Sequence, residues 1–257
     1  MAGSAGLLLI DSPIRTEDGR EWLSALASQG HPRYLVLLDY HPDRVLGARA
    51  FDVPILAHDL ARQIMSTWPD TYKGGLAPLG AEADRLKRVT GVREAIPELT
   101  FSDELRLLLG DREVLLHHSP GPTPASISVL VPESRLAFIG DIVGLDEPPF
   151  LGEADLQAWL ESLDWLKRLS QQRYRLISSR DGKVSAEGIS AMARFLTRVA
   201  GRLRKLAQEN QPATAAAHLA ASLLTGFHLP AARKEQALLR LQVGLTRLYS
   251  RFQSAED

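Results

Sequence analysis

The chain has 257 residues, of which 45% are hydrophobic and 24% charged, and its formal net charge is −1. This balance is ordinary for a globular protein, and it supplies no global positive field that would attract nucleic acid or anionic lipid. The chain contains no cysteine, which excludes disulfides and thiolate metal sites, so we expect a cytoplasmic protein.

The sequence also favours partners other than membranes and nucleic acids. We find no signal-peptide core near the first residue, and no segment reaches the roughly 18 apolar residues that a membrane span needs. The short basic patch around Arg202, Arg204 and Lys205 is best explained as a solvated helix face. We therefore expect a small molecule or another protein as the partner, whose identity the sequence does not give.

The first predicted elements form a strand–helix–strand unit. "GLLLID" at residues 6–11 and "RYLVLLD" at 33–39 are apolar runs typical of buried strands, and residues 17–30 between them have helical spacing. The second strand ends at Asp39, and His41 follows two residues later. Because sites in open α/β sheets form at the carboxyl ends of strands, these side chains are candidates for a functional site.

The middle of the chain predicts shorter elements. Residues 44–51 begin a helix, 53–58 form a strand, 72–80 form a loop, and 81–91 form a helix. Two hairpins follow, at residues 105–118 and 125–141, each with two apolar runs joined by turn residues.

The last third of the chain is mainly helical in pattern. Residues 153–170 predict an amphipathic helix, and 174–182 predict a strand that leads into a loop. Helical patterns then cover residues 186–210, 214–226 and 233–253, with a break at "ENQPAT". We therefore predict a first domain at residues 1–185 and a helical C-terminal region at 186–257.

The order of these pieces resembles the metallo-β-lactamase superfamily over residues 6–185. The resemblance rests on "LLLIDSP", "LLDYHPDRVLGA", "HHSPGPTPASISVLVPESRLAFIGDIV" and "LISSRDG", which stand where the family has its loop motifs. It implies an α/β (α+β) fold, a four-layer αββα sandwich shortened at the N-terminus, followed by a small helical unit. Since family members usually have further strands before the one that resembles "GLLLID", we expect a narrower sheet.

The same resemblance implies a metal site, but the residues match it only in part. His41, Asp43 and Asp141 occupy positions at which the family has the same residue type. The remaining ligand positions hold residues that the family does not have there: Asp39, Arg44, Pro122 and Arg180. A dinuclear zinc site built mainly from histidines cannot be assembled from this set.

If the fold is that of the family, three carboxylates converge with His41, and their charge has to be balanced. One solution is a single divalent metal, such as zinc, manganese or iron, on His41, Asp43 and Asp141, with Asp39 as a further ligand. The other is an internal ion-pair network in which Arg44 and Arg180 take the metal positions. We favour the second, because two guanidinium groups beside a cation are electrostatically unfavourable.

Simpler roles remain open for each of these residues. Asp39 and Asp43 are also typical of turns and helix caps, Asp141 could cap the turn that follows it, and His41 could be a surface histidine. His117 and His118 point to opposite faces of a strand, so at most one can enter a site, and we prefer His118.

The other histidines have structural interpretations. We place His58 at the rim of the site, and we expect structural roles for His218 and His228.

Three functions are consistent with this sequence. We favour a non-catalytic or weakly active member of the fold, a pseudoenzyme without a cofactor, whose cleft serves binding or assembly. The alternative is a single-metal hydrolase in which the metal activates water to attack an ester, thioester or other acyl substrate, while Arg44 or Arg180 holds an anionic group. The third is a scaffold that forms a homo-oligomer through the leucine-rich C-terminal helices. The sequence contains neither a Gly-x-Ser-x-Gly elbow nor a phosphate loop.

Overall fold

The structure is a computed structural model that describes residues 1–73 and 86–254. Within these residues the chain forms two compact units. The first comprises residues 1–73, 86–119 and 125–140, and the second comprises residues 120–124 and 141–254. The predicted boundary at residue 185 stays a prediction, since these units are defined by contacts rather than by independent folding.

The first unit contains a sheet whose strand order is β1-β2-β3-β4-β7. Its strands are β1 Ala2–Gly3, β2 Gly6–Ile10, β3 Pro32–Val36, β4 Ile55–His58 and β7 Leu99–Phe101. The last four pair in parallel, and helix α1, Thr16–Leu26, connects β2 to β3. This arrangement confirms the predicted strand–helix–strand unit.

A second, antiparallel sheet in the same unit contains both predicted hairpins. Its strands within this unit are β8 Glu104–Leu109, β9 Arg112–His118, β10 Ile127–Val131 and β11 Leu136–Phe138. Gly110 forms the first turn with a φ of 69°, a conformation that glycine adopts without the steric cost of a Cβ atom. The second turn is the 3₁₀ segment η4, Pro132–Ser134.

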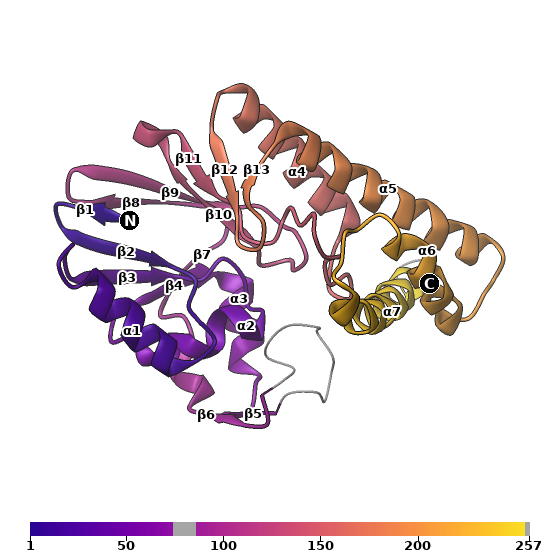
Figure 1. Ribbon diagram of the computed structural model, residues 1–257, viewed down its shortest axis with the longest axis horizontal. Coiled ribbons are helices and arrows are strands. Elements are labelled where there is room, and N and C mark those ends of the chain that lie inside the picture. The colour runs from indigo at the N-terminus through magenta and orange to yellow at the C-terminus, as the bar shows by residue number, and fades with distance from the viewer. Residues whose placement is uncertain (74–85, 255–257) are drawn as a thin grey trace. The chain divides into compact units, whose positions relative to one another are not determined.

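Alternating side chains of the parallel sheet build the two cores of this unit. Leu7 and Leu9 pack in one cluster, which faces the helices, whereas Leu8 between them packs in another. This second cluster also contains Val114 and Ile127 of the antiparallel sheet, so it fills the space between the two sheets. Figure 1 shows the parallel sheet lying between the second sheet and helices α1, α2 and α3.

Shorter elements complete the first unit. They are α2 Pro42–Val45, η1 Leu46–Ala50, α3 Asp59–Ser66, β5 Thr71–Tyr72, β6 Val89–Thr90 and η3 Val92–Ala95. The prediction of a helix at 81–91 is wrong where it can be compared, because Val89 and Thr90 pair with β5 as a strand. Residues 81–85 of that predicted helix, and most of the predicted loop at 72–80, lie outside the described residues.

The second unit is mainly helical. Its elements are α4 Leu156–Gln171, β12 Arg175–Ser178, β13 Gly182–Val184, α5 Ala186–Gln208, η5 Ala213–Leu219, α6 Ala220–Leu224 and α7 Ala231–Ser254. α4 packs against α5, and α7 packs against η5 and α6. The predicted leucine stripe of α7 is largely inside this unit, since Leu241 and Leu245 are fully buried and Leu248 is buried, whereas Leu239 is exposed.

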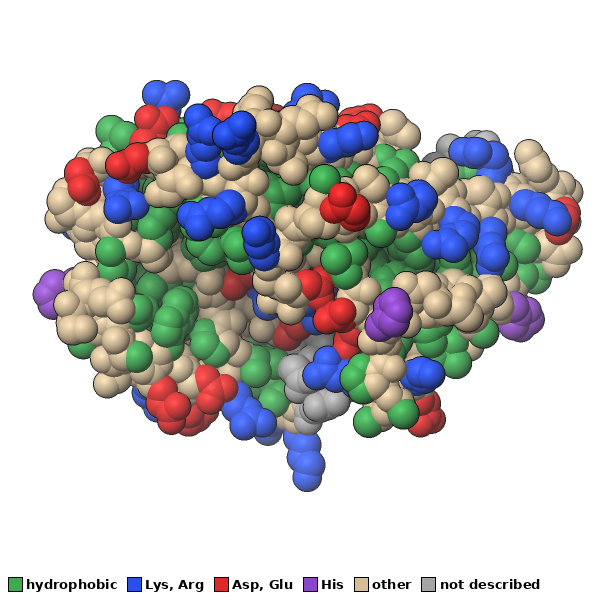
Figure 2. Space-filling view, turned by 45° about the horizontal axis from the view of Figure 1, so that its top comes forward, with side chains coloured by type: hydrophobic (Ala, Val, Ile, Leu, Met, Phe, Trp, Pro, Cys, Tyr) green, Lys and Arg blue, Asp and Glu red, His purple; other side chains and the backbone are tan. Residues whose placement is uncertain are grey.

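The surface and the helices agree with the composition. Basic and acidic side chains are interspersed over the face shown in Figure 2, as expected for a net charge of −1. Among the described helices, none combines the length and apolar character required to span a bilayer.

Candidate functional site

The loop that follows β3 is fixed from two directions within the first unit. Asp11, at the end of β2, accepts a hydrogen bond from the backbone N–H of Leu38 on Oδ1 at 2.8 Å. The carbonyl oxygen of Leu38 in turn accepts the N–H of Ile127 in the second sheet at 2.8 Å. Asp11 has a φ of 55°, in the left-handed region that aspartate tolerates better than most residues. Leu38 is therefore held between the two sheets, directly before Asp39.

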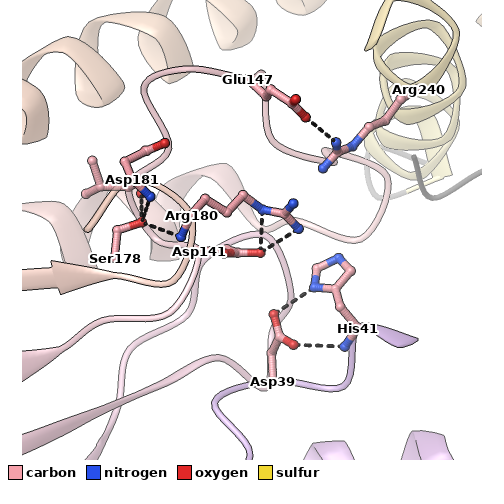
Figure 3. A network of polar contacts seen from close by, with 9 residues as sticks. Asp39, His41, Asp141, Glu147, Ser178, Arg180, Asp181 and Arg240 are labelled. Atoms are coloured by element: carbon pink, nitrogen blue, oxygen red, sulfur yellow. Dashed lines mark hydrogen bonds and ion pairs between the residues drawn. The ribbon is translucent and has the colours of Figure 1, made fainter. Parts of the chain in front are cut away.

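Asp39 uses both carboxylate oxygens on His41 (Figure 3). Oδ1 accepts the backbone N–H of His41 at 2.8 Å, and Oδ2 lies 2.7 Å from Nδ1 of its ring. Both side chains are buried. Because a carboxylate accepts the hydrogen bond, Nδ1 carries the proton and the ring is fixed with Nε2 on its other side. Asp39 therefore forms the turn that the simpler interpretation predicted and also orients His41.

The rest of this loop is a short helix that the sequence sets up locally. Pro42 stands in the first turn of α2, a position where its missing N–H costs nothing, and Asp43 lies in the same turn. The carbonyl oxygen of Arg44 accepts the Oγ–H of Ser12 at 2.8 Å. A Cβ atom on Gly47 would lie 1.6 Å from the carbonyl oxygen of Pro13. Glycine is thus required at position 47, because the backbone there approaches the backbone of Pro13 too closely for any side chain.

The second unit contributes Asp141 and Arg180, which form an ion pair. Nε and Nη2 of Arg180 lie 3.0 and 2.9 Å from the same oxygen of Asp141, Oδ2. The Asp141 side chain is 8% exposed and that of Arg180 is 25% exposed, so the pair is only partly screened by water. This is the arginine–carboxylate pairing that the sequence analysis favoured for Arg180.

The loop that carries Arg180 is joined to the segment that follows Asp141. Ser178 donates its hydroxyl to the carbonyl oxygen of Val143 at 2.8 Å, and its Oγ accepts the backbone N–H of Arg180 at 3.3 Å. Asp181 accepts the N–H of Leu145 at 2.6 Å. Burial raises the pKa of Asp181, and the nearby carboxylates of Asp146 and Asp141 raise it further. The position of Arg180 is thus set by the bonds of its neighbours.

Sequence reasoning missed a second ion-pair cluster in the same unit. Glu147 binds two arginines of α7. Its Oε1 lies 2.5 Å from Nη1 of Arg233. Its Oε2 lies 3.6 Å from Nη1 of Arg240, the pair drawn in Figure 3. Arg240 is 3% exposed. The only signal in the sequence is an arginine within the leucine-rich stripe, and its acidic partner is far away in the chain.

Among the histidines, the predicted position of His58 is wrong. His58 was expected at the rim, but it is buried, and its ring stacks on that of His118. His117, on the other side of the strand, lies 3.8 Å from Glu104. His218 and His228 are exposed on the second unit.

Each predicted site residue can thus be assigned to one of the two units. Asp39, His41, Asp43 and Arg44 belong to the first, and Pro122, Asp141 and Arg180 belong to the second. The pairing of the Arg44 guanidinium with a carboxylate stays a prediction.

These residues do not fit the dinuclear zinc centre that the resemblance implies. Asp39 and His41 in the first unit, and Asp141 in the second, offer ligand atoms of the kind that a metal ion takes. However, Pro122 has no donor atom in its side chain. The carboxylate oxygen of Asp141 already accepts two N–H groups of a guanidinium. A histidine-rich site with three or more ligands for each zinc ion cannot be built from this set.

Solved structures with a similar fold are metallo-β-lactamases. One from Pontibacter korlensis aligns with a TM-score of 0.60 and 18% identity, covering 77% of this chain and 85% of that one. DIM-1 metallo-beta-lactamase aligns with a TM-score of 0.58 and 17% identity, covering 77% and 85%. TMB-1 aligns with a TM-score of 0.55 and 15% identity, covering 78% and 84%. These likenesses confirm the predicted sandwich fold.

The sequence comparison leads to the same family. A search among curated proteins gave no match. The profile of the metallo-beta-lactamase superfamily matches residues 1–179, which is most of the chain and includes the Asp39, Asp141 and "LISS" segments. Together with the two facing sheets of the first unit, this match shows that the chain belongs to the metallo-β-lactamase superfamily.

Proposed function

We propose that this chain is a pseudoenzyme of its superfamily, non-catalytic or weakly active, whose degenerate metal site serves binding or assembly. The observation that carries the proposal is the ion pair of Asp141 and Arg180. The resemblance assigns Asp141 to the family's bridging ligand, and in this chain the same carboxylate oxygen accepts Nε and Nη2 of Arg180.

The charge balance supports this proposal. A divalent cation at the same oxygen would have to lie close to the guanidinium, which is always protonated. Two unit charges 4 Å apart repel by about 4 kcal/mol at an effective dielectric constant of about 20. The guanidinium instead neutralises a carboxylate that is 8% exposed, so the second unit needs no cation there.

A single-metal hydrolase is the second candidate, and the geometry of Asp39 and His41 favours it. Metal-binding histidines usually donate their second ring N–H to a carboxylate, which fixes the tautomer and the ring orientation. Asp39 holds His41 in this manner at 2.7 Å, with Nδ1 as the donor. In this candidate Asp39 orients His41 instead of binding the metal itself.

Elemental analysis of protein purified without chelators separates the two candidates. For the first, zinc, manganese and iron are each expected far below one equivalent per chain, and addition of these ions should leave the melting temperature unchanged. Near-stoichiometric metal that is lost in Asp141→Ala would overturn it and favour the second candidate. Asp164→Ala, an exposed aspartate on α4, is the matched control that should keep the wild-type metal content.

Arg180→Met tests the role assigned to the guanidinium. If the positive charge excludes a cation, this variant should bind more divalent metal than the wild type, measured by calorimetric titration with zinc or manganese. An Arg180→Met protein with wild-type metal binding would mean that the missing histidine ligands, and not Arg180, determine the result.

The assembly role has its own test. Leu239 is the exposed leucine of α7, with 49% of its surface accessible. If α7 forms a homo-oligomer, Leu239→Lys should reduce the particle mass in light scattering, whereas Leu108→Lys on the edge strand β8 should not. Equal masses for the wild type and Leu239→Lys would exclude an interface at this leucine.

A further inference from the structure

Two histidines connect the two sheets of the first unit. His58 is the last residue of β4 in the parallel sheet, and His118 is the last residue of β9 in the antiparallel sheet. Their rings are stacked, with centroids 3.9 Å apart and an interplanar angle of 28°. His58 is 4% exposed. The stack thus lies between the ends of two strands that are distant in the sequence.

Both ring nitrogens of His58 form hydrogen bonds, and the bond at Nδ1 requires the neutral ring. Nδ1 accepts the backbone N–H of Leu60 at 3.1 Å, which caps the N-terminus of α3. Nε2 lies 2.6 Å from the carbonyl oxygen of Ser102, to which it donates. One nitrogen must accept and the other must donate, so the tautomer is fixed. Protonation would place a hydrogen on Nδ1, facing the N–H of Leu60.

The charged groups around His58 come from three elements. His118 faces it from β9, Asp59 is the first residue of α3, and Asp103 lies in the turn between β7 and β8. Burial lowers the pKa of His58, and His118 lowers it further, while the bond to Ser102 and the two aspartates oppose this shift. The net direction of the pKa shift favours the neutral ring, which the bond from the Leu60 N–H to Nδ1 also requires.

The histidine stack is tied to the Asp39 loop through backbone bonds. His118 is the strand partner of Ile127, and the N–H of Ile127 donates to the carbonyl oxygen of Leu38, directly before Asp39. β4 is also the parallel neighbour of β3, since the N–H of Leu37 donates to Leu56. Opening of the stack would therefore loosen the edge that positions His41.

From this arrangement we propose that His58 and His118 form an acid-sensitive latch that joins the two sheets beside the Asp39–His41 loop. With neutral rings the latch is closed: His58 caps α3, binds Ser102 and stacks on His118. When His58 takes up a proton, the cap is lost and a positive charge lies against the second imidazole, so the latch opens. This device operates on the fold and does not depend on the proposed function.

The sign of the pH effect follows from linkage. The unfolded chain takes up the proton near the ordinary histidine pKa of about 6.5, whereas the folded chain resists it to lower pH. The stability contributed by the latch is therefore present above about pH 6.5 and is lost as pH falls toward the depressed pKa of His58. One such proton changes the unfolding equilibrium constant by up to about tenfold per pH unit.

The test combines a histidine titration by NMR with urea unfolding from pH 7.5 to 5.0. In the wild type, the ring signal of His58 should titrate below pH 6.5, and the amide signal of Leu60 should shift with the same midpoint. His58→Asn keeps a side chain that caps helices well but does not titrate. On acidification, the unfolding equilibrium constant of this variant should rise less steeply than that of the wild type. The difference between the two slopes should be up to about tenfold per pH unit. His31→Asn, at an exposed position, should behave as the wild type does.

Either of two results would overturn the latch. The first is an NMR titration in which His58 has its midpoint at or above pH 6.5, or in which the Leu60 amide signal does not shift with that midpoint. The second is an unfolding constant that depends on pH in His58→Asn as steeply as in the wild type. If that variant does not fold, the wild-type titration alone decides the outcome.

Discussion

Arg180 directs two N–H donors at one oxygen of Asp141, with Nε at 3.0 Å and Nη2 at 2.9 Å. The two residues are 39 positions apart in the sequence, and the carboxylate is largely withdrawn from water. The resemblance predicts that this carboxylate takes the place of a metal ligand, and in this chain it is bound by an arginine. The role of this pair can be tested by substitution.

Removal of the guanidinium should destabilise the protein. Arg180→Met removes the two N–H donors that Oδ2 of the buried Asp141 carboxylate accepts, so we expect the free energy of unfolding to fall by about 1–3 kcal/mol. Urea denaturation at pH 7 measures this change. Arg106→Gln is the matched control, because its pair with Glu113 on the antiparallel sheet is 65% and 41% exposed. That substitution should change stability by less than about 1 kcal/mol, and an equal loss in both variants would contradict the assigned role.

The carboxylate of Asp39 should be needed to hold its loop. Asp39→Ala removes the acceptor of two donors, the backbone N–H and the ring Nδ1–H of His41. Both donors are buried, so leaving them without an acceptor is costly. We expect the free energy of unfolding, measured by urea denaturation, to fall by about 1–3 kcal/mol. Asp52→Ala, at an exposed loop position of the same unit, should be close to neutral. A neutral Asp39→Ala would show that water replaces the carboxylate.

Two glycines provide opposite outcomes for the same substitution. A Cβ on Gly47 would lie 1.6 Å from the carbonyl oxygen of Pro13, so Gly47→Ala should cost more than about 3 kcal/mol or prevent folding. A Cβ on Gly201, within α5, would meet no atom within 4 Å. Gly201→Ala should therefore stabilise the protein by about 0.5–1 kcal/mol, because alanine favours helices. Thermal unfolding of the two variants checks both expectations.

Neutralisation of Asp181 should have an effect that depends on pH. Burial raises the pKa of this carboxyl, the hydrogen bond from the Leu145 N–H opposes this shift, and the charges of Asp146 and Asp141 add to it. A raised folded-state pKa means that the folded protein binds the proton of Asp181 more tightly than the unfolded chain does. The stability that this protonated carboxyl contributes is therefore lost as pH rises through the folded-state pKa. Asp181→Asn keeps an oxygen for the N–H of Leu145. It should be more stable than the wild type at pH 7, and this advantage should disappear near pH 4.

The control for that experiment is Asp164→Asn, an exposed position on α4. Its stability relative to the wild type should be the same at pH 7 and pH 4. A similar pH dependence in both variants would show that general surface charge, and not the burial of Asp181, produces the effect.

Local patterns were sufficient for much of the fold. The strand–helix–strand opening followed from two apolar runs around one helical repeat, and the structure pairs these strands in parallel. The first hairpin followed from two apolar runs that meet at Gly110, a residue that tolerates a positive φ. The helical pattern at 81–91 failed at Val89 and Thr90, because pairing with β5 outweighs helix propensity there.

The sequence by itself determined the candidate residues, and from their types at the motif positions we predicted a mismatch with a histidine-rich zinc site. Only the tertiary structure decided what those residues do: that Asp39 orients His41, that Arg180 binds Asp141, and that Glu147 meets a buried arginine of α7. It also moved His58 from a predicted rim to a buried stack with His118. The physical reason is the separation in sequence over which each kind of interaction acts. Periodicity and turn chemistry act over a few residues, whereas ion pairs and hydrogen bonds join side chains that only the folded chain brings together.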